Sequence, residues 1–296
     1  MDKMREANSI SQKPRILVLG DIAMDWIVQA SSLEMPVAKL SVECSEVITE
    51  RLGGGGLVFG VAAQEAGFAT TLVAAIGRDA SGAAGRQYLA DSGVTAILTE
   101  VNDASTGKSL IIRDEIRDVK AMVSHRGANV RLPRASIDGG LIDEADLVYV
   151  SGYSLLGEPQ ADTALHAMEV ARTVGVPVVL DVVPHRIFAQ PLSSQYLTGL
   201  SLASAIILEL GTARRLLGDM QMSEQEVVEA LLRRYVAIVL HPNNDVEVVA
   251  TRSGVRHSKT GYHDATQKTG YLDRSHARTL YELVSSNVGA LVRGPR

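Results

Sequence analysis

The sequence is poor in several features on which particular classes of protein depend. It contains one cysteine, Cys44, so no internal disulfide can form, which fits a reducing compartment and leads us to expect a cytoplasmic protein. Aromatic residues make up only 4% of the chain, which disfavours the base-stacking surfaces of single-strand nucleic-acid binders. No apolar run reaches the roughly 18–20 residues that a membrane-spanning helix requires.

The charge and the overall composition narrow the choice further. A net charge of −5 offers no support for binding to nucleic acid, and we expect neither nucleic acid nor a membrane as a partner. The 296 residues are 46% hydrophobic, enough for one large α/β domain with its own core, with or without a small lid. Residues 1–13 are polar and lack an apolar stretch, so we expect a disordered lead rather than a signal peptide.

The most informative stretch is a run of four glycines, Gly53 to Gly56, followed at once by an Ala- and Val-rich segment with helical spacing. Glycine lets the backbone approach a ligand closely, and the N-terminus of a following helix offers N–H groups and a positive dipole end. A flexible turn before a core helix is the alternative interpretation. Residues 70–94 then predict a buried strand, a polar turn and a short helix that ends at Gly93.

These segments resemble the N-terminal signature of the ribokinase-like (PfkB) sugar kinase family. In that family a GG-x-x-x-N loop contacts the sugar, and a G-x-D-x-x-G pattern, matched here by Gly77, Asp79 and Gly82, follows the next strand. The resemblance covers residues 14–296 and implies a ribokinase-like three-layer α/β/α domain with a central, mostly parallel sheet. It also implies a small β-lid, inserted as segments at about 36–52 and 104–124, through which a homodimer could form.

The remaining pattern alternates between strands and helices, which by itself predicts a parallel sheet covered on both faces. Strands are expected at residues 16–19, 145–153, 176–183, 237–240 and 246–251, helices at 162–174 and 224–235, and a strand followed by a helix at 204–218.

The resemblance assigns a substrate carboxylate. Gly20 and Asp25 fit the spacing of the family's Gly-x-x-x-x-Asp pattern, in which the aspartate accepts hydrogen bonds from two sugar hydroxyls. From the residues alone, an exposed turn carboxylate is an equal alternative for Asp25. The resemblance implies that the backbone of the glycine loop also binds substrate, through Gly53, Gly54 and Gly55. Val58 replaces the family's loop asparagine, which suggests a more apolar acceptor site.

The catalytic motif of the family, D-x-x-G-A-G-D, can be placed in two registers. The pattern KTGY-x-D occurs twice, beginning at Lys259 and again at Lys268. Register one starts the motif at Asp264 and leaves Gly270 at the position of the catalytic base. Register two keeps Asp273 as the base. Its anion hole would then consist of Gly270, Tyr271 and Leu272.

Other motifs depart from the family, and these departures keep a second function open. The turn that usually reads T-x-G-x-x-G and lines the nucleotide is HPNNDV at 241–246, the D-x-N-x-R segment is DVVPHR beginning at Asp181, and the N-x-x-E helix carries Glu209 and Thr212. The resemblance implies an ATP-dependent kinase that uses Mg²⁺ to phosphorylate a hydroxymethyl group on a sugar, a nucleoside or a related small alcohol. The alternative is a pseudokinase that senses a ligand or acts as a scaffold.

Three further features carry no catalytic prediction. The stretch ASTGKS at 104–109 is similar to a P-loop, but a strand pattern follows it where the motif needs a helix. Histidines 241, 263 and 276 lack the spacing of a metal-binding helix, so we expect solvated or capping roles and no metal site. Cys44 is expected to be a small buried residue rather than a nucleophile.

Overall fold

The computed structural model of the chain describes residues 13–29, 48–114, 119–184, 187, 192–260, 270–286 and 291. Most of the expected N-terminal lead and Cys44 lie outside the described residues, as do Asp264, His263 and the start of the second KTGY-x-D repeat. Among the described helices, none is both long and apolar enough to span a bilayer.

The main sheet has nine strands in the order β13-β12-β11-β10-β9-β8-β1-β4-β5. Pairing is parallel from β11 through to β5, and the edge strands β12 and β13 are antiparallel. The strands are β1 (Arg15–Leu19), β4 (Ala69–Gly77), β5 (Thr95–Val101), β8 (Leu147–Ser151), β9 (Val178–Asp181), β10 (Ala205–Glu209), β11 (Ala237–Asn243), β12 (Val246–Thr251) and β13 (Gly254–Lys259).

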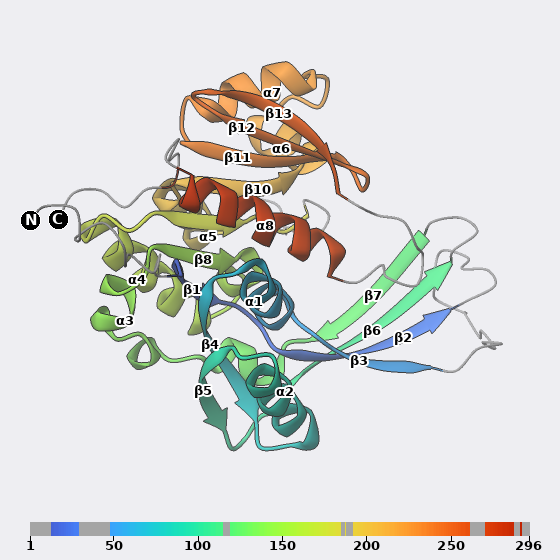
Figure 1. Cartoon of the computed structure of the whole chain (residues 1–296). Coiled ribbons are helices and arrows are strands. Elements are labelled where there is room, and N and C mark those ends of the chain that lie inside the picture. Colours follow the sequence, from blue (N-terminus) through green and yellow to red (C-terminus); the bar gives the residue numbers. More distant parts are fainter. Residues whose placement is uncertain are drawn as a thin grey trace, which may run out of the picture.

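Helices cover both faces of this sheet, as Figure 1 shows. Alternate residues of the strands contribute to two separate cores: α1, α2 and α8 pack into one, and α3 to α7 pack into the other. The helices are α1 (Gly55–Ala66), α2 (Ala80–Asp91), α3 (Gly139–Asp143), α4 (Gln160–Thr173), α5 (Ser194–Leu202), α6 (Leu210–Leu217), α7 (Glu224–Leu232) and α8 (Tyr271–Ser285), with short 3₁₀ helices η2 (Gly127–Arg131), η3 (Arg134–Ser136) and η4 (Gly152–Leu155).

A second sheet of four strands, here called the lid sheet, projects from one side of the main sheet (Figure 1). Its order is β3-β2-β6-β7, formed by β2 (Ala23–Gln29), β3 (Thr49–Gly53), β6 (Gly107–Asp114) and β7 (Val119–His125). Strands β6 and β7 overlap the expected segment at 104–124, and β3 overlaps the end of the segment at 36–52. Strand β2 was not expected from the sequence; it follows β1 after a short connection and continues directly into the lid sheet.

The centre of the main sheet determines where a ligand can bind. Strand β1 pairs with β4 on one side and with β8 on the other. After β1 the chain first forms the strands on the β4 side and later those on the β8 side, so the strand order reverses at β1. In open α/β sheets, ligands bind beyond the carboxyl ends of the strands at such a switch point. The end of β1, the glycine run and the beginning of α1 meet there.

Candidate active site

A cavity of about 580 Å³ lies between the end of β1, the inner face of the lid sheet and the first turn of α8. Residues from all three parts of the structure line it. Of the site residues expected from the sequence, those that line this cavity are Asp25, Gly54, Gly55, Gly270, Tyr271, Leu272 and Asp273.

Close packing of the backbone explains the glycine run. The carbonyl oxygen of Asp21 accepts hydrogen bonds from the N–H groups of Gly56 and Leu57 at 3.0 and 3.1 Å. Gly54 has a φ of 92°, and a β-carbon there would lie 2.4 Å from that carbonyl oxygen. A β-carbon on Gly56 would lie 2.5 Å from the backbone of Gly20. The run therefore lets the end of β1 touch the beginning of α1.

Asp25 presents its carboxylate from the inner face of the lid sheet. It lies on β2 next to Ser109 of β6, which in turn pairs with Ser124 of β7. The Ser124 hydroxyl donates to the Ser109 hydroxyl at 3.1 Å. Gly53 does not line the cavity. Across the same face, Ile111 and Met122 are register partners and add an apolar surface, so the cavity offers both polar and apolar walls.

The first turn of α8 forms the opposite wall. Gly270 is the N-cap, with a φ of 81° and no capping side chain, and Asp273 lies in the first turn. The first N–H groups of a helix have no partner within the helix, and the positive end of the dipole lies there. The first turn of α8 therefore gives the cavity both a carboxylate and a site for an anion. The residues that register two uses, Gly270 to Asp273, all line the cavity. Residues 264–269, which register one also uses, lie outside the described residues.

Burial shifts the pKa of two carboxyl groups near this wall. Burial raises the pKa of Asp273 to about 6, against the opposing effects of its own backbone N–H and of Arg274. Burial also raises the pKa of Asp181, at the end of β9, to about 7, and the nearby Asp273 and Glu209 add to this. The buried Tyr149 hydroxyl donates to Asp181 at 2.6 Å and opposes the shift. A carboxylate with a pKa near the working pH is suited to proton transfer.

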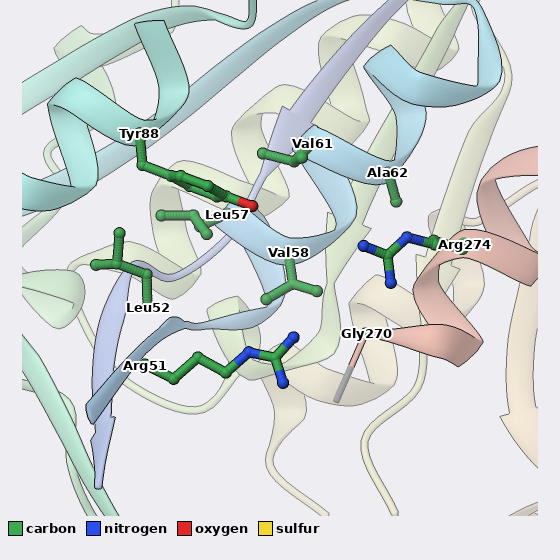
Figure 2. A pocket seen from close by; sticks show the side chains of 9 residues that line it. All are labelled: Arg51, Leu52, Leu57, Val58, Val61, Ala62, Tyr88, Gly270 and Arg274. Carbon is green, nitrogen blue, oxygen red and sulfur yellow. The ribbon is translucent and has the colours of Figure 1, made fainter. Parts of the chain in front are cut away.

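Val58, at the position of the family's loop asparagine, does not line this cavity. It lines a smaller pocket beside α1, where Figure 2 shows the side chains of Arg51 and Arg274 extending toward it. A β-carbon on Gly270 would lie 2.9 Å from Val58 Cγ1. Val58 therefore packs against the backbone from which α8 begins.

The G-x-D-x-x-G pattern has a structural role. Asp79 caps α2 by accepting a hydrogen bond from Gly82 N at 2.8 Å. It also accepts from the backbone N–H and the hydroxyl of Thr106, at 2.9 and 2.7 Å. A β-carbon on Gly77 would lie 2.5 Å from the carbonyl oxygen of Ala104. The pattern joins α2 to the segment that leads into the lid sheet.

The stretch that is similar to a P-loop is not one. Strand β6 begins inside this stretch, at Gly107, where a P-loop would lead into a helix. Its lysine, Lys108, borders the cavity, but the ammonium group lies 5.8 Å from the centre of the Trp26 ring. Trp26 is adjacent to Asp25 on β2 and faces the other side of the sheet. The ammonium group is therefore held at the outer face of the lid sheet.

The prediction of solvated or capping roles is wrong for His241 and His276. Both are buried, with exposed fractions of 6% and 5%. Their Nε2 atoms lie 2.6 Å apart, although the residues belong to β11 and α8. Sequence spacing within one helix could not reveal this pair, because the two residues come from separate elements.

A hydrogen-bonded network in the wall of the cavity was also missed. Arg126 donates from Nε and Nη2 to the carboxylate of Asp21, with distances of 3.1 Å. Gln160 donates to the same carboxylate at 2.7 Å. Asn129 holds Ile22 from both sides, because its Oδ1 accepts from Ile22 N and its Nδ2 donates to Ile22 O. Two members of this network, Arg126 and Asn129, come from the short sequence RGAN at 126–129.

The sequence of the chain is similar to those of known proteins. The model of the pfkB family carbohydrate kinases matches residues 13–259. The bifunctional protein HldE of a Nitratiruptor species is 31% identical over 193 residues, which are 57% of this chain and 36% of that protein. The chain thus spans about a third of the length of that relative.

Solved structures share the fold. Adenosine kinase from Sinorhizobium meliloti has a TM-score of 0.78 at 15% identity, covering 95% of this chain and 91% of that one. Fructokinase with bound ATP from Xylella fastidiosa has a TM-score of 0.68 at 16% identity, covering 95% and 89%. The expected ribokinase-like α/β fold with a mostly parallel central sheet is confirmed. Since the family match spans most of the sequence, the chain belongs to the pfkB family of carbohydrate kinases.

Proposed function

We propose that this protein transfers a phosphoryl group from ATP to a hydroxymethyl group on a sugar, a nucleoside or a related small alcohol. One observation carries the proposal: Asp25 and Asp273 line the same cavity from opposite walls, one from the lid sheet and one from the first turn of α8. The family and the names of the similar kinases support it.

The inner face of the lid sheet binds the acceptor. Asp25 accepts hydrogen bonds from two hydroxyls, and Ser109 and Ser124 offer further polar contacts. Ile111 and Met122 pack against the carbon skeleton. The backbone of Gly54 and Gly55 closes the opposite side of the acceptor, with Gly53 leaving space for Asp25. A polyol with one apolar face fits these walls.

Asp273 acts as the base. It accepts the proton of the attacking hydroxyl, and its pKa of about 6 leaves it ionised at neutral pH. The backbone at Gly270, Tyr271 and Leu272 forms the anion hole at the start of α8. Leucine in place of the second glycine keeps its N–H group, so the helix terminus can still stabilise negative charge.

The residues around the start of α8 fit ATP and Mg²⁺. When bound, ATP supplies the phosphoryl group and Mg²⁺ neutralises its charge. The first turn of α8 suits the phosphoryl end, and the carboxylates of Asp181 and Glu209, at the ends of the adjacent strands β9 and β10, would hold Mg²⁺. Both carboxylates offer the oxygen ligands that this ion prefers.

The hairpin between β11 and β12 favours a second candidate, a pseudokinase that senses a ligand or acts as a scaffold. The Asn243 side-chain oxygen accepts hydrogen bonds from the N–H groups of Asp245 and Val246 at 2.9 and 3.1 Å. These N–H groups are therefore already used within the turn. In the family this is the turn that lines the nucleotide, and its glycines are absent here. A chain that binds a sugar without ATP would retain the lid sheet and its aspartate.

Ligand-induced thermal stabilisation distinguishes the two functions. Purified protein is heated with Mg²⁺–ATP, with Mg²⁺–ADP, and with each member of a panel of sugars and nucleosides, and a ligand at 100-fold over its Kd should add about 2.7 kcal/mol of stability. Stabilisation by nucleotide, together with nucleotide-dependent phosphorylation of an alcohol that also stabilises the protein, supports the kinase. Stabilisation by a sugar or nucleoside alone supports the sensor and contradicts the kinase.

The outer face of the lid sheet is proposed to pair with a second copy of the chain. Trp26, Leu110 and Val123 are register neighbours on that face, and Val123 is 71% exposed. Such a row of exposed apolar side chains is typical of an interface. We expect a dimer in sedimentation velocity and a monomer for Val123→Glu. A wild-type monomer at all concentrations would contradict the pairing. A cytoplasmic location fits the single cysteine.

A further inference from the structure

Three buried side chains with metal-binding atoms meet on the side of the main sheet covered by α8. His241 lies on β11, Glu247 on β12 and His276 on α8. Their exposed fractions are 6%, 1% and 5%, and their candidate ligand atoms lie within 4.8 Å of one another. None of the three lines the large cavity, so the cluster is separate from the proposed acceptor site.

An irregularity in the sheet brings the first two residues together. The pairing of β11 with β12 shifts register between Leu240 and Asn243, so His241 and Pro242 lie opposite Glu247. A bulge of this kind re-aims the side chain of the bulged strand. His276 reaches the same place from the second turn of α8. The cluster therefore spans two strands and a helix.

The cluster has one ligand atom that no hydrogen bond uses. Within the described part of the chain, Glu247 Oε2 is buried without a hydrogen-bond partner. The other carboxylate oxygen, Oε1, accepts from the Thr279 hydroxyl, which leaves Oε2 directed at the histidines, 4.0 Å from His241 Nε2. Buried polar atoms without partners are rare in native proteins and require an explanation.

Burial affects the pKa of both imidazoles. Burial lowers the pKa of His241, against the opposing effects of Glu247, a hydrogen bond with the backbone of Val246, and Glu209. Burial and the neighbouring His241 lower the pKa of His276 further. Imidazole nitrogens and carboxylate oxygens are the atoms through which such side chains ligate a metal ion.

We propose that His241, Glu247 and His276 bind a divalent transition metal ion, with zinc as the preferred ion, through two imidazole nitrogens and one carboxylate oxygen. Two imidazoles and a carboxylate form a known zinc ligand set, with solvent in the fourth position. Zn–N bonds of about 2.0–2.1 Å at tetrahedral angles separate two nitrogens by about 3.3 Å. The two Nε2 atoms are 2.6 Å apart without an ion. They must therefore move about 0.7 Å further apart when the ion binds.

The ion ties α8 to the main sheet. Asp273 precedes His276 by one turn of the same helix, so the metal fixes the helix that carries the proposed base without touching the acceptor. Thr279 orients the carboxylate from the next turn, as groups outside the ligand set commonly do. This role does not depend on phosphoryl transfer, since a pseudokinase would retain it.

Metal content and metal affinity test the proposal on the full chain, purified without an affinity tag. Elemental analysis of protein equilibrated with zinc and desalted should give about one zinc per chain, and zinc added after chelation should raise Tm by about 5 °C. Glu247→Gln and His276→Gln should each lose at least tenfold in zinc affinity. His257→Gln, which alters an exposed histidine paired with Glu224, should retain wild-type affinity.

Two further measurements keep the test independent of variant folding. Thr279→Val, which leaves all three ligands in place, should weaken zinc binding about tenfold. Cobalt added to the wild-type chain should give the visible absorption of a tetrahedral ion, and equimolar zinc should abolish it. A wild-type chain that retains no zinc, shows no cobalt absorption and is not stabilised would overturn the proposal. So would equal zinc affinity for wild type, Glu247→Gln and His276→Gln.

Discussion

The carboxylate of Asp25 occupies the space that a side chain at position 53 would need: a β-carbon on Gly53 would lie 2.1 Å from Asp25 Oδ2. Replacing Gly53 with alanine should therefore push the carboxylate out of place. We expect Gly53→Ala to weaken acceptor binding at least tenfold and to destabilise the fold by about 1–3 kcal/mol. Titration with the acceptor found by thermal shift, together with urea unfolding, measures both effects.

Gly139→Ala is the matched control, because nothing lies within 4 Å of a β-carbon at that position. It should leave binding unchanged. Equal acceptor affinity for Gly53→Ala and Gly139→Ala would show that Asp25 does not bind the acceptor.

The pKa of Asp273 sets the pH dependence of the reaction. With a pKa of about 6, the rate of phosphorylation under kcat/KM conditions should rise with pH below that value and level off above it. Asp273→Asn should lower the rate by about 10²–10⁴-fold and abolish the rise. A pH–rate profile for both proteins checks this. An unchanged rate in Asp273→Asn would exclude register two.

The raised pKa of Asp273 also predicts how stability depends on pH: raising the pH should increase the reaction rate but lower the stability of the fold. Between the ordinary value of 3.8 and about 6, the folded state holds the Asp273 proton more tightly than the unfolded state. Stability from this group is thus fully present at low pH and is lost as the pH rises through about 6. Asp273→Asn should have a higher Tm than wild type at about pH 8 and a similar Tm near pH 3.5, as calorimetry can show. A lower Tm at about pH 8 would contradict the burial of this charge.

Asp79 should stabilise the fold without contributing to catalysis. Although burial opposes it, hydrogen bonds from Thr106 and Gly82 lower the pKa of Asp79 below 3.8. Its contribution is therefore present above pH 3.8 and is lost as the pH falls through the lowered value. Asp79→Ala should cost about 1–3 kcal/mol in urea unfolding at neutral pH. Asp91→Ala, which removes an exposed acceptor for Gln87, should cost less than about 0.5 kcal/mol.

The pair of Arg126 and Asp21 is partly buried, with side-chain exposures of 20% and 11%. Removing the guanidinium leaves the carboxylate with Gln160 as its remaining side-chain partner. Arg126→Leu should destabilise the chain by about 3 kcal/mol in equilibrium unfolding. Arg134→Leu, which breaks the exposed pair with Asp162, should cost less than about 1 kcal/mol. Equal costs would mean that burial adds nothing to the first pair.

The sequence was sufficient for the fold where local pattern and tertiary structure agree. The apolar run of β1, the glycine run before α1 and the alternation from β8 to β12 all appear as expected. Asp25 and Asp273 were predicted from the family resemblance, and both line the cavity, Asp25 from within β2 and Asp273 from the first turn of α8. Their roles stay predictions. The choice between the two KTGY-x-D registers stays a prediction, since both repeats have the same local pattern and residues 261–269 lie outside the described residues.

The features that the sequence did not predict depend on contacts between elements that are distant in the chain. Strand β2 was missed because its side chains do not alternate in polarity as a half-buried strand usually does, with Asp25 facing the cavity and Trp26 facing outward. The His241 and His276 pair depends on a register shift in one hairpin and on the angle at which α8 crosses the sheet. No spacing within a single segment encodes either of these.

The two hydrogen bonds between the Asn129 side chain and the backbone of Ile22 limit how the lid sheet can move. Ile22 connects β1 to β2, and both its N–H and its carbonyl oxygen are held by one buried side chain. The connection therefore cannot swing as a free hinge. Closure over a ligand must come from twisting and bending of the lid strands beyond Ile22. The edge of the lid sheet would then move furthest, while the base of β2, just before Asp25, stays fixed next to the end of β1.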